Sequence, residues 1–301
     1  MAITLRNGEL TLRVETAGET YRGSRFDWNG LVSSAKFRGV ELLGQEKPMF
    51  QRNPRLFGRG LHNEFGINRC IGYDECAVGE VFPKIGTGWL RRDANPYFFF
   101  TQYVIEPIEF EYDAQDNTRA VFHCDSGTRN GYGYSYTKEI SLEGPSFTIR
   151  YTLENSGEKA LETDEYVHNF LCFGGRRMDS GYALEFPWTL NKSRFAEVND
   201  PDGMLNVNGK TVDVTKKTSN QFYLGAVSNG VTASDGLAAQ WTLRNASLGV
   251  SLSERGSFEP TNVAVWGWKS VISPELFHSF KVLPGDSISW ERVYTASRLD
   301  S

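Results

Sequence analysis

The chain has 301 residues, a formal net charge of -5, and 40% hydrophobic and 23% charged residues, which is the composition of a globular protein. The acidic balance and the absence of a basic stripe argue against nucleic acid or an anionic membrane as partners. No run of about 18 apolar residues occurs, so the sequence predicts no membrane-spanning segment.

The N-terminus and the cysteines indicate a cytoplasmic protein without a metal site. The first residues, Met-Ala-Ile-Thr-Leu-Arg, lack the basic and then apolar pattern of a secretory signal. The cysteines at positions 70, 76, 124 and 172 form no CxxC pair and are too sparse for a disulfide scaffold. We therefore expect reduced thiols and no bound metal.

Short alternating apolar runs begin at the N-terminus. Residues 3–15 alternate around Asn7-Gly8, and Asn29-Gly30 separates a run at 24–28 from a run at 31–37. Asn-Gly between such runs is a strong short-range signal for a β-hairpin. These segments therefore predict pairs of antiparallel strands.

The stretch from Gln45 to Asp93 differs from what precedes it. Glycine or proline interrupts its apolar runs, while six aromatic residues argue against disorder. Long irregular stretches inside a compact domain are usually functional or disordered, so we expect ordered loops that wall a ligand site. Candidate ligand contacts among its charged residues are Arg59, Glu64, Asp74 and Lys84.

Strand signals continue to the C-terminus. Alternation over 147–153, a turn at 155–158 and a second run from Leu161 to His168 predict two strands around a turn. Turn residues recur roughly every 8–12 positions, and no long stretch has the period of a helix. The sequence therefore predicts an all-β fold, a large antiparallel β-sandwich or barrel, with a single domain over 1–301.

His168 is the first candidate for a chemical role. It stands at the end of its predicted strand, where a rigid ladder fixes the direction of its ring. Asp164, Glu165 and Asn169 crowd it in the sequence, and a nearby carboxylate favours the imidazolium form near neutral pH. The alternative is a buried histidine that is hydrogen-bonded to the backbone.

Glu275 is the second candidate. It follows Pro274 and lies downstream of Trp266 and Trp268, in an apolar neighbourhood. Desolvation there would raise its pKa toward the range of a general base. Trp266 is a further candidate contact, because aromatic rings line sugar sites. The alternative for Glu275 is a solvated loop glutamate.

These segments resemble the galactose mutarotase (aldose 1-epimerase) superfamily in their order and spacing. The resemblance is carried by Phe57-Gly-Arg59, Tyr166-Val-His168-Asn-Phe170, Ser273-Pro-Glu275 and Leu283-Pro-Gly-Asp286. It runs from the N-terminal hairpins to Tyr294 and implies a mutarotase-like β-supersandwich with a sugar cleft on one face. Arg59 resembles the arginine that contacts the sugar.

The resemblance implies an acid and a base. In the family, a histidine protonates the ring oxygen while a glutamate removes the proton of the anomeric hydroxyl, and the opened ring closes on its other face. Carried over, His168 is the acid and Glu275 the base, and no metal or organic cofactor is needed. The implied function is interconversion of the anomers of a free sugar, with a small carbohydrate as the partner.

One segment departs from the family pattern. Where the family has a second histidine after the arginine, this chain has Lys84, and His62 lies too close to Arg59 to take that place. A lysine would suit a developing alkoxide or an acidic sugar, such as a uronate or a sugar phosphate. The alternative for Lys84 is an ordinary solvated lysine.

Two other functions stay open from the sequence. The same scaffold can carry a non-catalytic carbohydrate-binding protein. It can also carry a glycan-active lyase or hydrolase, with Lys84, Tyr73 or Tyr132 as acid or base, because a fold does not fix a function.

Overall fold

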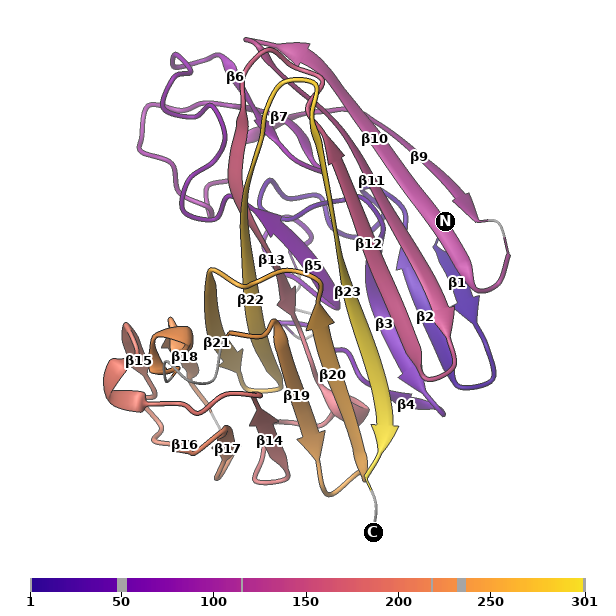
Figure 1. The fold of residues 1–301 in the computed structure, drawn as a ribbon, viewed down its shortest axis with the longest axis vertical. Coiled ribbons are helices and arrows are strands. Elements are labelled where there is room, and N and C mark those ends of the chain that lie inside the picture. Colours follow the sequence, from indigo (N-terminus) through magenta and orange to yellow (C-terminus); the bar gives the residue numbers. More distant parts are fainter. Residues whose placement is uncertain (1, 48–52, 115, 218, 232–236, 300–301) are drawn as a thin grey trace.

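The computed structural model describes residues 2–47, 53–114, 116–217, 219–231 and 237–299. Within these residues, strands are joined by loops and by the short 3-10 helices η2 (Phe173–Gly175), η3 (Lys192–Arg194) and η4 (Val227–Gly230). Two large antiparallel sheets and a small one hold the strands (Figure 1). This confirms the predicted all-β antiparallel class. In the same part of the chain, no helix has the length and apolar character needed to cross a membrane.

The first sheet carries both candidate residues near its middle. Across the sheet its strands are β1 (Ile3–Arg6), β2 (Leu10–Glu15), β3 (Leu31–Phe37), β5 (Leu61–Phe65), β13 (Leu161–Asn169), β22 (Val271–Val282), β21 (Asn262–Trp268), β18 (Gln221–Gly225) and β15 (Glu197–Asn199), with β4 (Val40–Glu41) beside β3. Strands β5, β13 and β22 are therefore adjacent although they come from distant parts of the sequence.

The second sheet faces the first, and a small third sheet is attached at one end. The second sheet consists, in spatial order, of β16 (Leu205–Asn208), β17 (Thr211–Val214), β14 (Tyr182–Glu185), β19 (Gln240–Asn245), β20 (Val250–Gly256), β23 (Ser287–Arg298), β12 (Ser146–Glu154), β11 (Tyr132–Glu143), β10 (Arg119–Arg129) and β9 (Glu109–Ala114). The third sheet consists of β6 (Val81–Lys84), β7 (Gly88–Arg91) and β8 (Val104–Pro107).

The core lies between the two large sheets. Alternating side chains of β12, from Phe147 to Leu153, are buried and share one hydrophobic cluster with Leu161 and Val167 of β13. Both predicted strands are present, but they do not pair with each other. Strand β12 pairs with β11 and β23, whereas β13 pairs with β5 and β22. The turn between them therefore carries the chain from one sheet to the other.

Of the two hairpins predicted at Asn-Gly near the N-terminus, the structure contains the first. Asn7-Gly8 joins β1 to β2, as predicted. The segment 24–28 before Asn29-Gly30 is not a strand, so the second predicted hairpin is wrong. That segment instead runs beside β5, where the backbone N–H of Asp27 donates to the carbonyl of Asn63 at 2.9 Å.

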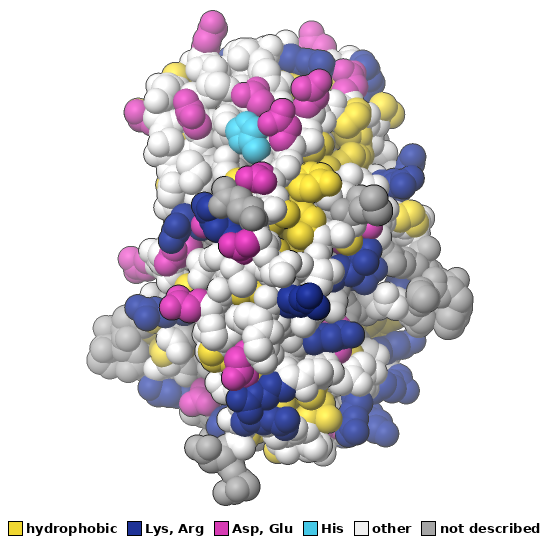
Figure 2. Space-filling model, turned by 90° about the vertical axis from the view of Figure 1, so that its right-hand side faces the viewer, with side chains coloured by type: hydrophobic (Ala, Val, Ile, Leu, Met, Phe, Trp, Pro, Cys, Tyr) yellow, Lys and Arg dark blue, Asp and Glu magenta, His cyan; other side chains and the backbone are white. Residues whose placement is uncertain are grey.

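Charges of both signs share the face of the molecule shown in Figure 2. Acidic side chains predominate in its upper part and basic ones in its lower part, with hydrophobic side chains between them. This face therefore presents no single-sign surface of the kind that steers a highly charged polymer.

Candidate active site

His168 and Glu275 lie next to each other on the outer face of the first sheet, the face that points away from the core. Strands β13 and β22 are antiparallel neighbours with Glu165 opposite His278, and the same register puts His168 opposite Glu275. Nδ1 of His168 and Oε1 of Glu275 are 3.6 Å apart. Each residue is only 5% exposed. The two side chains are thus neighbours in a nearly closed site, not opposite walls of an open hollow.

Aromatic rings enclose the imidazole of His168. The ring of Phe170 stacks on it, with centroids 4.2 Å apart and an interplanar angle of 5°. Trp266 of β21 meets it edge to face at 4.9 Å, and Phe26 does so at 5.9 Å. These rings exclude water from the pair, and the loss of solvation disfavours a charge on either residue.

Burial shifts the pKa values of the two residues in opposite directions. It lowers the pKa of His168 well below its usual range, and Arg25 and His62 lower it further. Burial raises the pKa of Glu275 to about 8, against the opposing effects of the Ser273 hydroxyl and Arg25. At neutral pH the resting pair is therefore a neutral imidazole and a protonated carboxyl. This form has the same number of protons as the alternative form, in which His168 is an imidazolium and Glu275 a carboxylate.

The pKa of Glu275 predicts a pH dependence of stability. Because this pKa rises from 4.5 to about 8 on folding, the native state holds a proton between these values that the unfolded state has lost. The resulting stabilisation is fully present below pH 4.5 and is lost as the pH rises to about 8. Relative to Glu275→Gln, the wild type should lose up to about 1.4 kcal/mol per pH unit in this range. Urea unfolding measures this loss, and parallel curves for the two proteins would contradict the raised pKa.

Arg25 places a cation beside the pair. Its Nε donates to Oε2 of Glu64 at 2.7 Å, and its Nη2 donates to the hydroxyl of Tyr166 at 3.0 Å. The Tyr166 hydroxyl donates to the same Glu64 oxygen at 2.5 Å. The guanidinium also lies 4.5 Å from the ring centroids of Phe26 and Phe99. A guanidinium held in this way can stabilise an oxygen that gains negative charge during a reaction.

In its fold, the chain is similar to several solved structures. No protein-family model matches the chain, and no curated protein matches it. A solved structure from Synechocystis sp. PCC 6803 has a TM-score of 0.60 at 12% identity and covers 99% of this chain and 96% of its own. A galactose mutarotase-like protein from Clostridium acetobutylicum has a TM-score of 0.59 at 11% identity, covering 99% and 95%. An aldose epimerase homologue from C. elegans has a TM-score of 0.59 at 13% identity, covering 100% and 99%.

The chain has the galactose mutarotase-like fold. The fold implied by the sequence motifs is therefore confirmed over the whole chain. At these identities the likeness concerns the fold alone, and the chemistry has to be argued from the side chains.

Within the mutarotase-like fold, Lys84 is buried. It ends β6, is 1% exposed, and donates from Nζ to the carbonyl of Phe65 at 2.5 Å and to the hydroxyl of Tyr97 at 3.1 Å. Its burial contradicts the alternative of a solvated lysine. Internal hydrogen bonds occupy its ammonium group, and its role as a sugar contact stays a prediction.

The structure shows other contacts for two further candidates from the sequence, Arg59 and Asp74. Arg59 forms an ion pair with Glu15 of β2 at 3.6 Å, and β2 is three strands from β13 in the sheet. Asp74 is exposed on the loop between β5 and β6, where it lines a small cavity of about 140 Å³. The arginine beside the pair is Arg25 instead, which the sequence analysis did not single out. Glu64, as its ion-pair partner, does lie near the pair.

The pair can transfer protons without further groups. Among the described residues, no three His, Cys, Asp or Glu side chains gather in a way that could hold a metal ion. The four cysteines are buried and free. Proton exchange between a bound hydroxyl and a neighbouring imidazole or carboxyl needs only those two side chains. The expectation of no cofactor stays a prediction.

Proposed function

We propose that the protein is an aldose 1-epimerase, which interconverts the anomers of a free sugar. The proposal is carried by the 3.6 Å approach of His168 Nδ1 to Glu275 Oε1 in a nearly closed site. Opening an aldose ring needs one proton delivered to the ring oxygen and one removed from the anomeric hydroxyl. These two oxygens share one carbon atom, so an acid and a base in contact with each other can reach both.

The proposed reaction passes one proton around the pair. From the resting pair, the Glu275 carboxyl first passes its proton to His168, whose Nδ1 lies 3.6 Å away. The His168 imidazolium then protonates the ring oxygen, the Glu275 carboxylate takes the anomeric proton, and the bond between C1 and the ring oxygen breaks. The open-chain aldehyde turns about its C1–C2 bond, and the reverse transfers close the ring on its other face. The open-chain stage corresponds to neutral His168 and protonated Glu275, which is the form that burial favours at rest. Arg25 stabilises negative charge on the sugar oxygens.

The charges near the pair favour a neutral sugar. Arg25 is already paired with Glu64 at 2.7 Å, and internal hydrogen bonds hold the ammonium of Lys84. An acidic sugar would bring a further negative charge into a nearly closed site, and burying an unpaired charge is costly. We therefore propose a neutral aldose in place of the acidic sugar expected from Lys84.

Anomer exchange in freshly dissolved α-D-glucose and α-D-galactose tests this function, followed by polarimetry and by NMR. The expected result is exchange faster than in buffer and proportional to protein concentration. Sugar binding without faster exchange would instead support a carbohydrate-binding protein. Release of fragments from oligosaccharides would support a lyase or hydrolase.

A further inference from the structure

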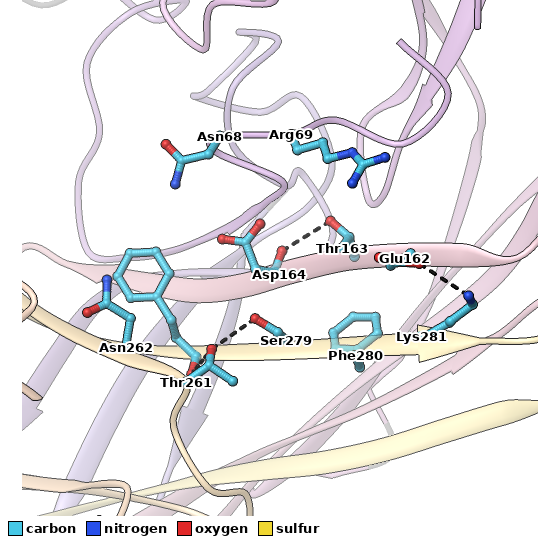
Figure 3. Close-up of a pocket in the computed structure, with 11 residues that line it drawn as sticks. Asn68, Arg69, Glu162, Thr163, Asp164, Thr261, Asn262, Ser279, Phe280 and Lys281 are labelled. Atoms are coloured by element: carbon cyan, nitrogen blue, oxygen red, sulfur yellow. Dashed lines mark hydrogen bonds and ion pairs between the residues drawn. The ribbon is translucent and has the colours of Figure 1, made fainter. Parts of the chain in front are cut away.

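A cavity of about 810 Å³ lies on the outer face of the first sheet, and its nearest lining residue on β22 is two residues from Glu275 (Figure 3). It reaches Phe277, which is two residues along β22 from Glu275, and Asn262, which lies opposite Phe277 on β21. The Phe277 ring stacks on Tyr166 with centroids 4.5 Å apart. This volume is within the range of small-molecule sites, so the cavity can hold a ligand group next to the pair.

The cavity extends along the strands that carry the pair. Asp164 of β13 and Ser279 of β22 both line it and lie opposite each other. Asp164 is four residues before His168, and Ser279 is four residues after Glu275. Because a strand rises about 3.3 Å per residue, these two residues are ~13 Å from the pair. With Phe277 two residues from Glu275, the cavity spans roughly 7 to 13 Å from the pair along the strands, where the next sugar of a chain would lie.

Hydroxyl-binding groups line this cavity from several elements. They include the Asn68 and Asn262 amides, the Thr261 and Ser279 hydroxyls, and the charged groups of Arg69 and Asp164. Figure 3 shows Asn68 and Arg69 across the cavity from Asp164. Phe277 adds an aromatic ring against which the C–H face of a sugar can pack.

The charges of the cavity are balanced. Its remaining charged residues, Glu162 and Lys281, form an ion pair with each other at 3.3 Å, and Arg69 lies across the cavity from Asp164 (Figure 3). Two cations and two carboxylates give no preference for an anionic ligand, so these groups suit a neutral ligand that is rich in hydroxyls.

Asp164 is oriented for a ligand. Its carboxylate points into the cavity, and no described side chain donates a hydrogen bond to it. Burial raises its pKa to about 6, against the effect of Lys84. Because the carboxylate is partly exposed, a sugar hydroxyl can donate a hydrogen bond to it in place of solvent.

We propose that this cavity is a second sugar subsite, which binds a neutral sugar residue linked to the one whose anomeric carbon lies at His168 and Glu275. The inference rests on the proposed function and specifies its substrate class. The substrate is a short reducing oligosaccharide, and a free monosaccharide fills only the part of the site at the pair.

The test compares disaccharides with the monosaccharide at their reducing end. Glucose is compared with maltose and cellobiose, and galactose with β-1,4-galactobiose. Anomer exchange by NMR gives kcat/KM, and titration calorimetry gives Kd. At least one disaccharide should exceed its monosaccharide in both affinity and kcat/KM by roughly tenfold, the effect expected from a few added hydrogen bonds.

Variants of the cavity locate this preference. Ser279→Trp should fill the cavity and bring the ratio of disaccharide to monosaccharide kcat/KM down to about one. The milder Asp164→Asn should lower the ratio in part, which keeps the test valid if the tryptophan disturbs folding. Ser287→Trp is the matched control, because Ser287 is exposed at the start of β23 in the other sheet, and it should keep the wild-type ratio.

The outcomes separate this inference from the proposed function. Monosaccharide exchange without any advantage for a disaccharide would overturn the subsite and leave the function standing. Tighter disaccharide binding that Ser279→Trp removes, with no anomer exchange at all, would support the subsite and overturn the function. Absence of binding and of exchange for every sugar would overturn both.

Discussion

Glu275→Gln and His168→Gln are each expected to lower kcat for anomer exchange by about 10²–10⁴-fold, the usual contribution of a general acid or base. In Glu275→Gln the introduced amide would keep the size of the glutamate and could still accept the hydrogen bond from Ser273, which donates at 3.1 Å, but it could not take up the anomeric proton. In His168→Gln the introduced amide cannot protonate the ring oxygen, as an imidazolium can. NMR exchange spectra at saturating sugar measure kcat, and KM should change little.

Two control variants match these substitutions in chemistry. Glu143→Gln changes an exposed carboxylate at the end of β11, and His123→Gln changes a half-buried histidine on β10, both in the second sheet. Both controls should exchange anomers at the wild-type rate. A fully active Glu275→Gln or His168→Gln protein would show that the assigned roles are wrong.

The double variant distinguishes a coupled pair from two separate residues. If one proton cycles between His168 and Glu275, the loss of either residue stops the cycle, and the double variant should be no slower than the slower single variant. Losses that multiply in the double variant would mean that the two residues act independently.

The burial of the strands could be predicted from the sequence, but their partners could not. Alternation over 147–153 correctly placed these side chains in the core, because period two is a local property of a strand. The turn at 155–158 has the same local pattern whether a chain returns to its own sheet or crosses to another. The contact that accompanies the crossing is tertiary: Nδ2 of buried Asn155 donates to the carbonyl of Val282 at 2.9 Å.

The candidate site, too, could be predicted only in part from the sequence. His168 stood out because it ends a predicted strand among acidic and polar neighbours, and Glu275 because it is a carboxylate in apolar sequence. Arg25 did not, because it lies in an irregular segment and its partners, Glu64 and Tyr166, come from two other strands. Lys84 could not be placed for the same reason, since its burial depends on residues far from it in the sequence.

Arg292→Met is expected to destabilise the protein by about 3–5 kcal/mol, the effect of breaking a buried ion network. Arg292 is fully buried and joins the two sheets, donating from Nη2 to Glu165 at 2.6 Å and from Nη1 to Glu254. Nη2 also donates to the carbonyl of Leu276, next to Glu275, at 3.0 Å. Without the arginine, two buried carboxylates would lack a counterion. Urea unfolding at neutral pH measures the loss.

Arg150→Met is the matched control, because it changes an arginine of β12 that forms an ion pair with Glu291 of β23. Its ion pair with Glu291, at 3.1 Å, is partly exposed to solvent, with the arginine side chain 57% exposed. Surface pairs of this kind contribute about 0–1 kcal/mol. A similar loss in the two variants would contradict a special role for the buried network.

A triple variant can separate two causes of this loss of stability, uncompensated charge and lost packing. Combining Arg292→Met with Glu165→Gln and Glu254→Gln removes the stranded charges along with the cation, so part of the lost stability should return. A triple variant as unstable as Arg292→Met alone would place the cost in the packing of the arginine. Recovery would instead place the cost in the two uncompensated carboxylates, Glu165 on β13 and Glu254 on β20.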